Sequence, residues 1–190
     1  MRRPARFLPL SLPFLGLSFI VCGRPAPGQE ALQISSTAIA GVRVCDPLTS
    51  VRKAFPQARD TLIGDESDSD STPGTIVHLS EDQWILFETS SLDPTRIWRI
   101  ATNSPRYRTG HGYRVGMSVD QILRRGEKLS FGYPEGYLAI DIVSENIGFQ
   151  VEDSAARRFF SHVGYKEDPL RALDKNARIK LFGIGRDCRP

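Results

Sequence analysis

A short pattern occurs twice in this chain and constrains its fold more than any other feature. Segment 41–51 reads GVRVCDPLTSV, and segment 112–122 reads GYRVGMSVDQI. Five positions recur 71 residues apart. Three pairs are identical, Gly41/Gly112, Arg43/Arg114 and Val44/Val115, and two are similar apolar residues, Leu48/Val119 and Val51/Ile122. Each copy predicts a short extended run followed by a helix with one apolar face.

The two predicted helices begin with different signals. Asp46 can accept backbone N–H bonds at a helix start, and Pro47 at the next place has no N–H to leave unpaired. In the second copy, Ser118 and Gln121 have the spacing of a capping box, and Gly126 indicates the helix end.

The similarity continues beyond the helices at other offsets. At an offset of 64, Ser80-Glu81 matches Ser144-Glu145, and each copy predicts a β-hairpin with a four-residue turn, 80–83 or 144–147. At an offset of 82, segment 96–100 matches 178–182 as a third strand. The sequence thus predicts an α+β fold of two tandem αβββ units, 41–101 and 112–184, with short helices packed on one face of an antiparallel sheet.

The N-terminus has the composition of an export signal. Residues 1–23 combine three arginines with an apolar run of signal-peptide length, and residues 24–40 read as a flexible leader before a single domain, 41–190. Cleavage after Gly23 is one outcome, and lipid attachment at Cys22 is the other. We therefore expect an extracytoplasmic protein, periplasmic or secreted, without a transmembrane segment once the signal is removed.

Charge and cysteine content narrow the choices further. The chain has 25 basic and 22 acidic residues, and the signal removes three arginines and no acid, so the mature chain is balanced. Net charge therefore gives no support for nucleic-acid binding. With Cys22 removed or lipidated, Cys45 and Cys188 remain, and an exported chain predicts a disulfide between them that fastens the C-terminal tail.

Segment 116–122, GMSVDQI, resembles the helix opening of the SmpA/OmlA (BamE-like) envelope lipoproteins. The tandem helix-plus-sheet layout also resembles the β-lactamase inhibitor protein. The resemblance implies helices on one face of an antiparallel sheet and a protein-binding, non-catalytic role. The first copy departs from the motif, because Cys45-Asp46-Pro47 stands where Gly-Met-Ser stands in the second.

Catalytic, metal and cofactor signatures do not occur as motifs in the sequence. Of the histidines, His78 matches Ile142 and is expected in the core, His111 lies in a loop between the copies, and His162 lies in an insert at 155–176. The acidic run 65–72 lacks the EF-hand pattern and reads as a disordered loop. We expect no enzyme, no metal and no cofactor.

Arginine and aromatic residues alternate in a segment that contains no acid between Arg96 and Arg114. This pattern suits an anionic partner such as an acidic protein face, a glycan or a lipid head group, although a solvated strand and loop would look the same. The candidate binding residues here are Arg96, Trp98, Arg99, Arg106 and Tyr107.

The second face of the first hairpin supplies the other binding candidates. A four-residue turn puts Val77 opposite Leu86 and Leu79 opposite Trp84, all facing away from the helix. In the second copy, Val77, Leu86, Leu79 and Trp84 correspond to Asp141, Gln150, Val143 and Gly148, in that order, and Trp98 corresponds to Lys180. This face is therefore apolar in the first copy and more polar in the second. The apolar face of the first copy needs a cover, which is either the insert, with Phe159 and Phe160, or a partner.

These observations favour a non-catalytic binding or envelope-assembly module whose partner is a protein or another envelope component. A small hydrolase with a site near the repeat junction is the alternative, and it requires His111 or His162 to reach a serine and a carboxylate. A lipid or small-ligand carrier is a third reading, and it requires an enclosed apolar cavity between helices and sheet.

Overall fold

The computed structural model describes residues 32–64, 71–90, 92–132, 138–152, 154, 173–186 and 188. The predicted signal peptide, Cys22, most of the acidic loop, and the insert residues Phe159, Phe160 and His162 lie outside these ranges.

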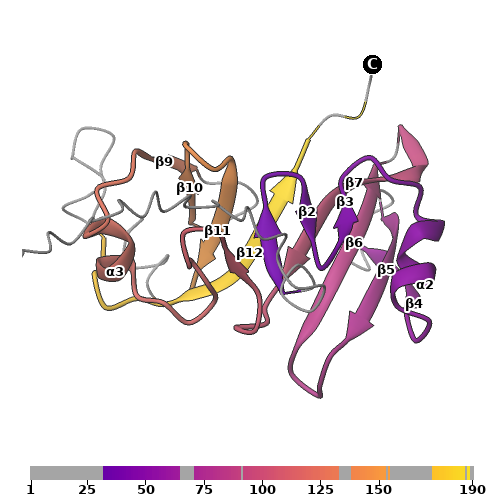
Figure 1. The fold of residues 1–190 in the computed structure, drawn as a ribbon, viewed down its shortest axis with the longest axis horizontal. Coiled ribbons are helices and arrows are strands. Elements are labelled where there is room, and N and C mark those ends of the chain that lie inside the picture. Colours follow the sequence, from indigo (N-terminus) through magenta and orange to yellow (C-terminus); the bar gives the residue numbers. More distant parts are fainter. Residues whose placement is uncertain are drawn as a thin grey trace, which may run out of the picture.

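An eight-stranded sheet forms the body of the molecule (Figure 1), with the order β4-β5-β6-β7-β12-β11-β10-β9. Adjacent strands are antiparallel, so two four-stranded meanders meet where β7 pairs with β12. The strands are β4 (Arg59–Ile63), β5 (Thr72–His78), β6 (Trp84–Ser90), β7 (Asp93–Thr102), β9 (Leu129–Gly132), β10 (Ala139–Ile142), β11 (Ile147–Val151) and β12 (Ile179–Gly185).

A small sheet of four short strands has the order β3-β2-β1-β8. Its strands are β1 (Gln33–Ser35), β2 (Ala38–Ile39), β3 (Val42–Arg43) and β8 (Arg108–Thr109), and β1 pairs with β8 in parallel. Strands β1 and β2 lie within the predicted flexible leader, so that prediction is wrong for residues 33–39. Ile34 and Ile39 are buried, and this burial ties the segment to the core.

The described helices are short: α2 (Thr49–Ala54) has 6 residues and α3 (Val119–Leu123) has 5. The structure is therefore mostly β, and the predicted α+β fold of two αβββ units with helices packed on a sheet is wrong. Helix α2 stops at Phe55, whose φ of −135° and ψ of 87° suit the residue before Pro56, because proline disfavours a helical conformation in its predecessor.

One of the two predicted helix starts is confirmed, and the other is wrong. Ser118 and Gln121 form the expected capping box at α3. Asp46 does not cap α2. Its carboxylate accepts the backbone N–H of Arg43 instead, and the helix begins after Leu48 without a side-chain cap.

The core lies between one face of the large sheet and a layer made of the small sheet and both helices, and Figure 1 shows the small sheet between α2 and α3. Val51 of α2 and Ile122 of α3 are buried with Ile85 and Phe149 of the large sheet. Side chains alternate along strands, so the neighbours of these core residues point to the opposite face of the large sheet.

The first hairpin differs from its predicted register. His78 pairs with Trp84, so five residues separate the strands instead of four. Val77 consequently pairs with Ile85 in the core, whereas His78 is exposed on the other face. The predictions of an outward Val77 and a core His78 are both wrong, because one extra turn residue exchanges the faces of β5.

The second hairpin has a four-residue turn, as expected, but one residue earlier. Ile142 pairs with Ile147, so the turn is 143–146. Asp141, Gly148 and Gln150 still alternate with core residues, in agreement with their expected outward positions.

Matching backbone bonds join the segment before each helix to the last strand of each meander. The Cys45 N–H donates to the Ile97 carbonyl, and the Gly116 N–H donates to the Ile179 carbonyl. These donors are 71 residues apart and the acceptors 82 apart, which are the offsets found in the sequence. The two segments therefore have the same local framework.

Two arginines complete this framework. Arg96 Nη1 donates to the Cys45 carbonyl at 2.9 Å, and Arg178 Nη1 donates to the Gly116 carbonyl at 2.8 Å. Each arginine also forms an isolated antiparallel bridge, one with Pro47 and the other with Ser118. Arg96 therefore has a structural partner on the chain itself.

The predicted Cys45–Cys188 disulfide is present, with the Cα atoms 5.4 Å apart. It joins the segment before α2 to the tail after β12, and a bond of this kind is consistent with an extracytoplasmic location. Within the described ranges, the structure contains no helix that is long and apolar enough to cross a membrane.

Candidate binding groove

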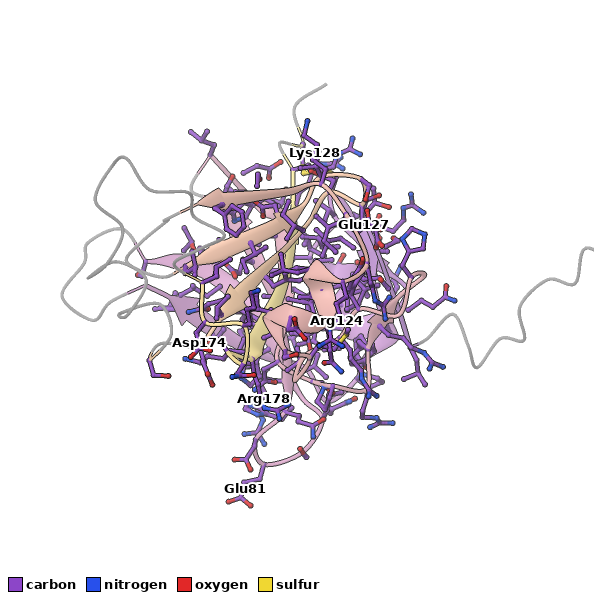
Figure 2. The ribbon with its side chains drawn as sticks, turned by 90° about the vertical axis from the view of Figure 1, so that its left-hand side faces the viewer. Glu81, Arg124, Glu127, Lys128, Asp174 and Arg178 are labelled. Carbon is purple, nitrogen blue, oxygen red and sulfur yellow. A yellow bond between two sulfur atoms is a disulfide. The ribbon has the colours of Figure 1, made fainter. Side chains whose placement is uncertain are left out.

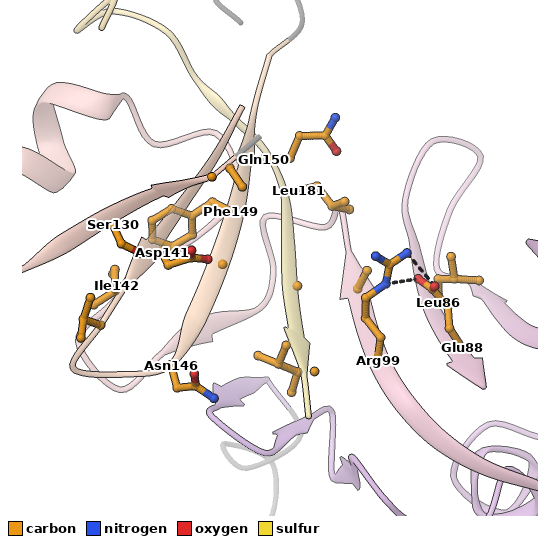
Figure 3. Close-up of a pocket in the computed structure, with 18 of the residues that line it drawn as sticks. Leu86, Glu88, Arg99, Ser130, Asp141, Ile142, Asn146, Phe149, Gln150 and Leu181 are labelled. Carbon is orange, nitrogen blue, oxygen red and sulfur yellow. Dashed lines mark hydrogen bonds and ion pairs between the residues drawn. The ribbon is translucent and has the colours of Figure 1, made fainter. Parts of the chain in front are cut away.

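The face of the large sheet away from the helices is hollowed by a groove of about 640 Å³ (Figure 3). Seven of the eight strands contribute to it, and it crosses the junction of the two meanders. Its outward-facing lining residues are Ile63, Trp84, Leu86, Glu88, Arg99, Ala101, Ser130, Gly132, Ala139, Asp141, Gly148, Gln150, Leu181, Gly183 and Gly185, with Val143 and Asn146 from the β10–β11 turn.

A row of small residues forms the floor of the groove. Strand pairing places Ala101 beside Gly183, and Gly183 beside Gly148. A Cβ atom added to Gly183 would meet no atom of the described residues within 4 Å, so these residues leave the space above it open. The hollow is therefore a consequence of absent side chains at the centre of the sheet.

One end of this row is polar. Asp141 pairs with Gly148 on β11 and with Ser130 on β9. The Ser130 hydroxyl donates to Asp141 Oδ2 at 3.2 Å. Asp141 Oδ1 would lie 2.7 Å from a Cβ atom on Gly148, so the glycine makes room for the carboxylate to lean across the floor.

The other side of the groove is apolar, apart from one ion pair. Trp84 and Leu86 from β6 lie across from Leu181 of β12. Beside them, Arg99 Nε donates to Glu88 Oε1 at 2.9 Å, and Arg99 Nη2 lies 2.6 Å from Glu88 Oε2. The Glu88 side chain is 4% exposed, so this two-point pair neutralises a carboxylate that is nearly removed from water.

The sequence candidates fall in different environments. Trp84, Leu86 and Arg99 line the groove. Trp98 is not a lining residue: it is 38% exposed, and its ring centre lies 5.6 Å from the guanidinium carbon of Arg99. Val77 and Tyr107 are buried. Arg106 is exposed after β7.

Burial raises the pKa of the Tyr107 phenol, and neighbouring Arg106 opposes this effect. The arginine and aromatic residues of segment 96–114 therefore do not share one environment: some hold the framework, some fill the core and some are exposed.

Sequence reasoning missed the groove itself. It treated Asp141, Gly148 and Gln150 only as the polar counterparts of an apolar face. A usable signal was present, because Gly148 and Gly183 lie inside strands, and glycine within a strand often marks the close approach of a ligand or another chain.

A second polar cluster lies at the end of the second meander. His111 Nδ1 is 2.5 Å from Glu145 Oε1 and 4.0 Å from Glu127 Oε1. The Ser144 hydroxyl donates to Glu127 Oε2 at 2.8 Å. His111 thus reaches a carboxylate, but the serine bonds to the other carboxylate. The arrangement lacks the serine–histidine contact that the hydrolase alternative requires.

Tyr113 lies beneath this cluster and is fully buried. Burial, followed by the nearby Glu127 carboxylate, raises the pKa of its phenol, and Arg125 acts in the opposite direction. The Arg125 guanidinium lies 4.6 Å from the ring centre. The Tyr113 hydroxyl makes no hydrogen bond of normal geometry.

The cluster belongs to the second half alone. Glu81, which aligns with Glu145, lies at the tip of the β5–β6 turn, far from Glu127 in Figure 2. Tyr113 aligns with Val42, a buried apolar residue. Among the described residues, no group of three or more His, Cys, Asp or Glu side chains is arranged to hold a metal ion.

No family model and no curated protein matches this sequence. Among solved structures, the chain is similar to the crystal structure of the uncharacterized protein YfeY from Escherichia coli, with a TM-score of 0.55 and 11% sequence identity. The match covers 81% of this chain and 99% of that chain. At this identity the likeness shows a shared fold and nothing about function.

Proposed function

We propose that the chain is an exported, non-catalytic binding protein of the cell envelope that holds its partner in the groove. Export rests on the signal-like residues 1–23 together with the Cys45–Cys188 disulfide. The mature protein begins near Arg24, or at a lipid-modified Cys22, and works in the periplasm or as a secreted protein.

The observation that carries the proposal is the open space above Gly183. Glycine inside a strand costs stability relative to residues with side chains, and no described neighbour would contact a Cβ atom here. An empty floor flanked by Trp84, Leu86 and a few polar groups has the character of a binding site, and its volume lies within the usual range of about 300–1,000 Å³.

The two other functions have less support. The described hollow lies on the face opposite the helices, whereas a carrier of the predicted kind needs a cavity between helices and sheet. The His111–Glu145 contact favours a hydrolase, but the Ser144 hydroxyl donates to the Glu127 carboxylate and not to the His111 imidazole that would activate it in a serine–histidine pair.

Photo-crosslinking in cells that produce the protein tests the proposal. A benzophenone amino acid at Leu86 should form a light-dependent adduct, and the same group at exposed Glu81 serves as the position control. The mass of the adduct distinguishes a protein partner from a small molecule.

Gly183→Leu should abolish the adduct by filling the floor, while Gly110→Leu, at another glycine with open surroundings, should leave it unchanged. Because a strand interior favours leucine over glycine, Gly183→Leu should not lower stability. Equal adducts from Leu86 and Glu81, or an adduct that survives Gly183→Leu in a folded protein, would overturn the proposal.

A further inference from the structure

We propose that the groove takes a long basic side chain, arginine or lysine, from a partner protein, with Asp141 receiving its cationic head. This inference rests on the proposed function, because it names the chemistry of the partner that the groove holds.

The first observation is the charge state of the groove. Within the described part of the chain, the carboxylate of Asp141 makes one side-chain contact, the Ser130 hydroxyl at 3.2 Å, and forms no ion pair. Other carboxylates of this structure have arginine partners: Arg52 lies 2.6 Å from Asp60, and Arg124 lies 2.6 Å from Asp120. Asp141 thus presents a negative charge inside a hollow, and no cationic side chain among the described residues forms an ion pair with it.

The second observation is that the other charges of the groove offset one another. Among the described lining residues, Glu88 and Arg99 form a two-point ion pair, and the remaining charged side chain is the carboxylate of Asp141. A carboxylate or phosphate ligand would meet repulsion from Asp141, while a cation gains attraction. This charge balance opposes the anionic partner suggested by the arginine-rich segment.

The third observation is the path that leads to Asp141. The row from Asp141 continues through Gly148 and Gly183 to Ala101 and Leu86. Strands are about 4.8 Å apart, so the open floor at Gly183 begins about 10 Å from β10. A basic side chain has the matching shape, because its methylene stem packs on apolar surface while its charged head reaches a polar group.

Polar groups around Asp141 fit the head of such a side chain. Asn146 and Gln150 also line the groove, on opposite sides of Asp141 in Figure 3, and offer amide oxygens that accept hydrogen bonds. A guanidinium donates up to five hydrogen bonds in one plane, and an ammonium donates three. The groove therefore supplies acceptors at one end and apolar contact along its floor.

A peptide titration of the ¹⁵N-labelled mature chain, residues 24–190, tests the inference. The probe is an acetylated, amidated peptide Gly-Gly-Arg-Gly-Gly, and its control contains citrulline, which has the same shape without the charge. The arginine peptide should shift the backbone amide signals of Gly148 and Gly183 with at least fivefold higher affinity than the citrulline peptide. This preference should weaken as the salt concentration rises from 0.05 to 0.5 M, because the screening length falls from about 14 Å to about 4 Å.

Variants distinguish recognition of the arginine charge from binding of the peptide in the groove. Asp141→Asn should remove the preference for arginine over citrulline, whereas Asp60→Asn, at a surface ion pair, should retain it. Equal binding of both peptides, abolished by Gly183→Leu, would leave the groove as a binding site and overturn the basic-side-chain inference. Absence of groove shifts with either peptide, or a preference that survives Asp141→Asn, would also overturn it. Failure of the crosslinking experiment would instead overturn the proposed function.

Discussion

Cys45 and Gly116 occupy equivalent places in the two halves of the molecule. Their φ angles are 73° and 85°, and each residue donates its N–H to an isoleucine carbonyl and accepts an arginine hydrogen bond on its own carbonyl. The left-handed region suits glycine and is unfavourable for a residue with a side chain. Cys45 therefore holds a conformation that its counterpart adopts freely, and it does so at the site of the disulfide.

Removing the disulfide should have a cost that depends on the replacement at Cys45. The bridged residues are 143 apart in sequence, and the chain-entropy model gives about 5 kcal/mol as an upper figure for so long a loop. Cys45→Gly with Cys188→Ser should lose about 1 kcal/mol less stability than Cys45→Ser with Cys188→Ser, because glycine relieves the left-handed backbone. Urea unfolding of both double variants measures the difference, and equal stabilities would contradict it.

The two framework arginines should differ in importance. Arg178→Met removes the bond to the Gly116 carbonyl and should cost about 1 kcal/mol. Arg96→Met removes the matching bond to Cys45 but should cost less, because the disulfide still holds that segment. Thermal unfolding compares the variants with and without reductant. The difference in melting temperature between Arg178→Met and Arg96→Met should narrow on reduction. An unchanged difference would show that the disulfide does not compensate for the lost Arg96 hydrogen bond.

The ion pair beside the groove should contribute far more than an exposed one. Glu88→Gln neutralises a carboxylate that is 4% exposed and breaks its two-point ion pair with Arg99, whose side chain is 32% exposed, so a loss of about 2 kcal/mol is expected. Asp60→Asn breaks the pair with Arg52, whose side chains are 51% and 72% exposed, and should cost less than about 1 kcal/mol. Chemical denaturation measures both values, and similar losses would indicate that burial does not decide the difference.

Tyr113→Phe should change stability by less than about 1 kcal/mol at neutral pH, because two effects oppose each other. It removes a buried hydroxyl that makes no hydrogen bond of normal geometry, and it also removes the contact of this hydroxyl with the Glu127 carboxylate. The wild-type phenol has a raised pKa in the folded state, so the unfolded chain loses this proton first as pH rises. Stability should therefore fall as pH increases above about 10, the ordinary tyrosine pKa. This fall should be smaller in Tyr113→Phe, as measured by denaturation between pH 8 and 11, and an identical slope in both proteins would contradict the assignment.

Local chemistry could be predicted where neighbouring residues along the chain suffice. The capping box at Ser118 and Gln121 formed as expected, because both residues lie within one helical turn. The Cys45–Cys188 pairing was also predictable, because the expected export, with Cys22 removed or lipidated, left one partner for each remaining cysteine.

The mostly β architecture needed the tertiary structure. Each copy predicted a helix with one apolar face, but α2 ends before Pro56 after 6 residues, and the small sheet covers the remaining core. Strands β4 and β9 lie at the two sheet edges and were not anticipated, because short segments at an edge contact one neighbouring strand and carry little alternation.

Which side chains share the groove was decided by register and by the meeting of β7 with β12. One extra residue in the β5–β6 turn moved Val77 into the core and His78 out of it, and a change of one residue in a turn has no signature in apolar pattern alone. Asp141, Gly148 and Gly183 come from three strands whose order in the sheet depends on long-range pairing. The sequence by itself therefore determined the cap of α3 and the disulfide, which depend on few residues, while only the tertiary structure determined the groove, which depends on how distant strands align.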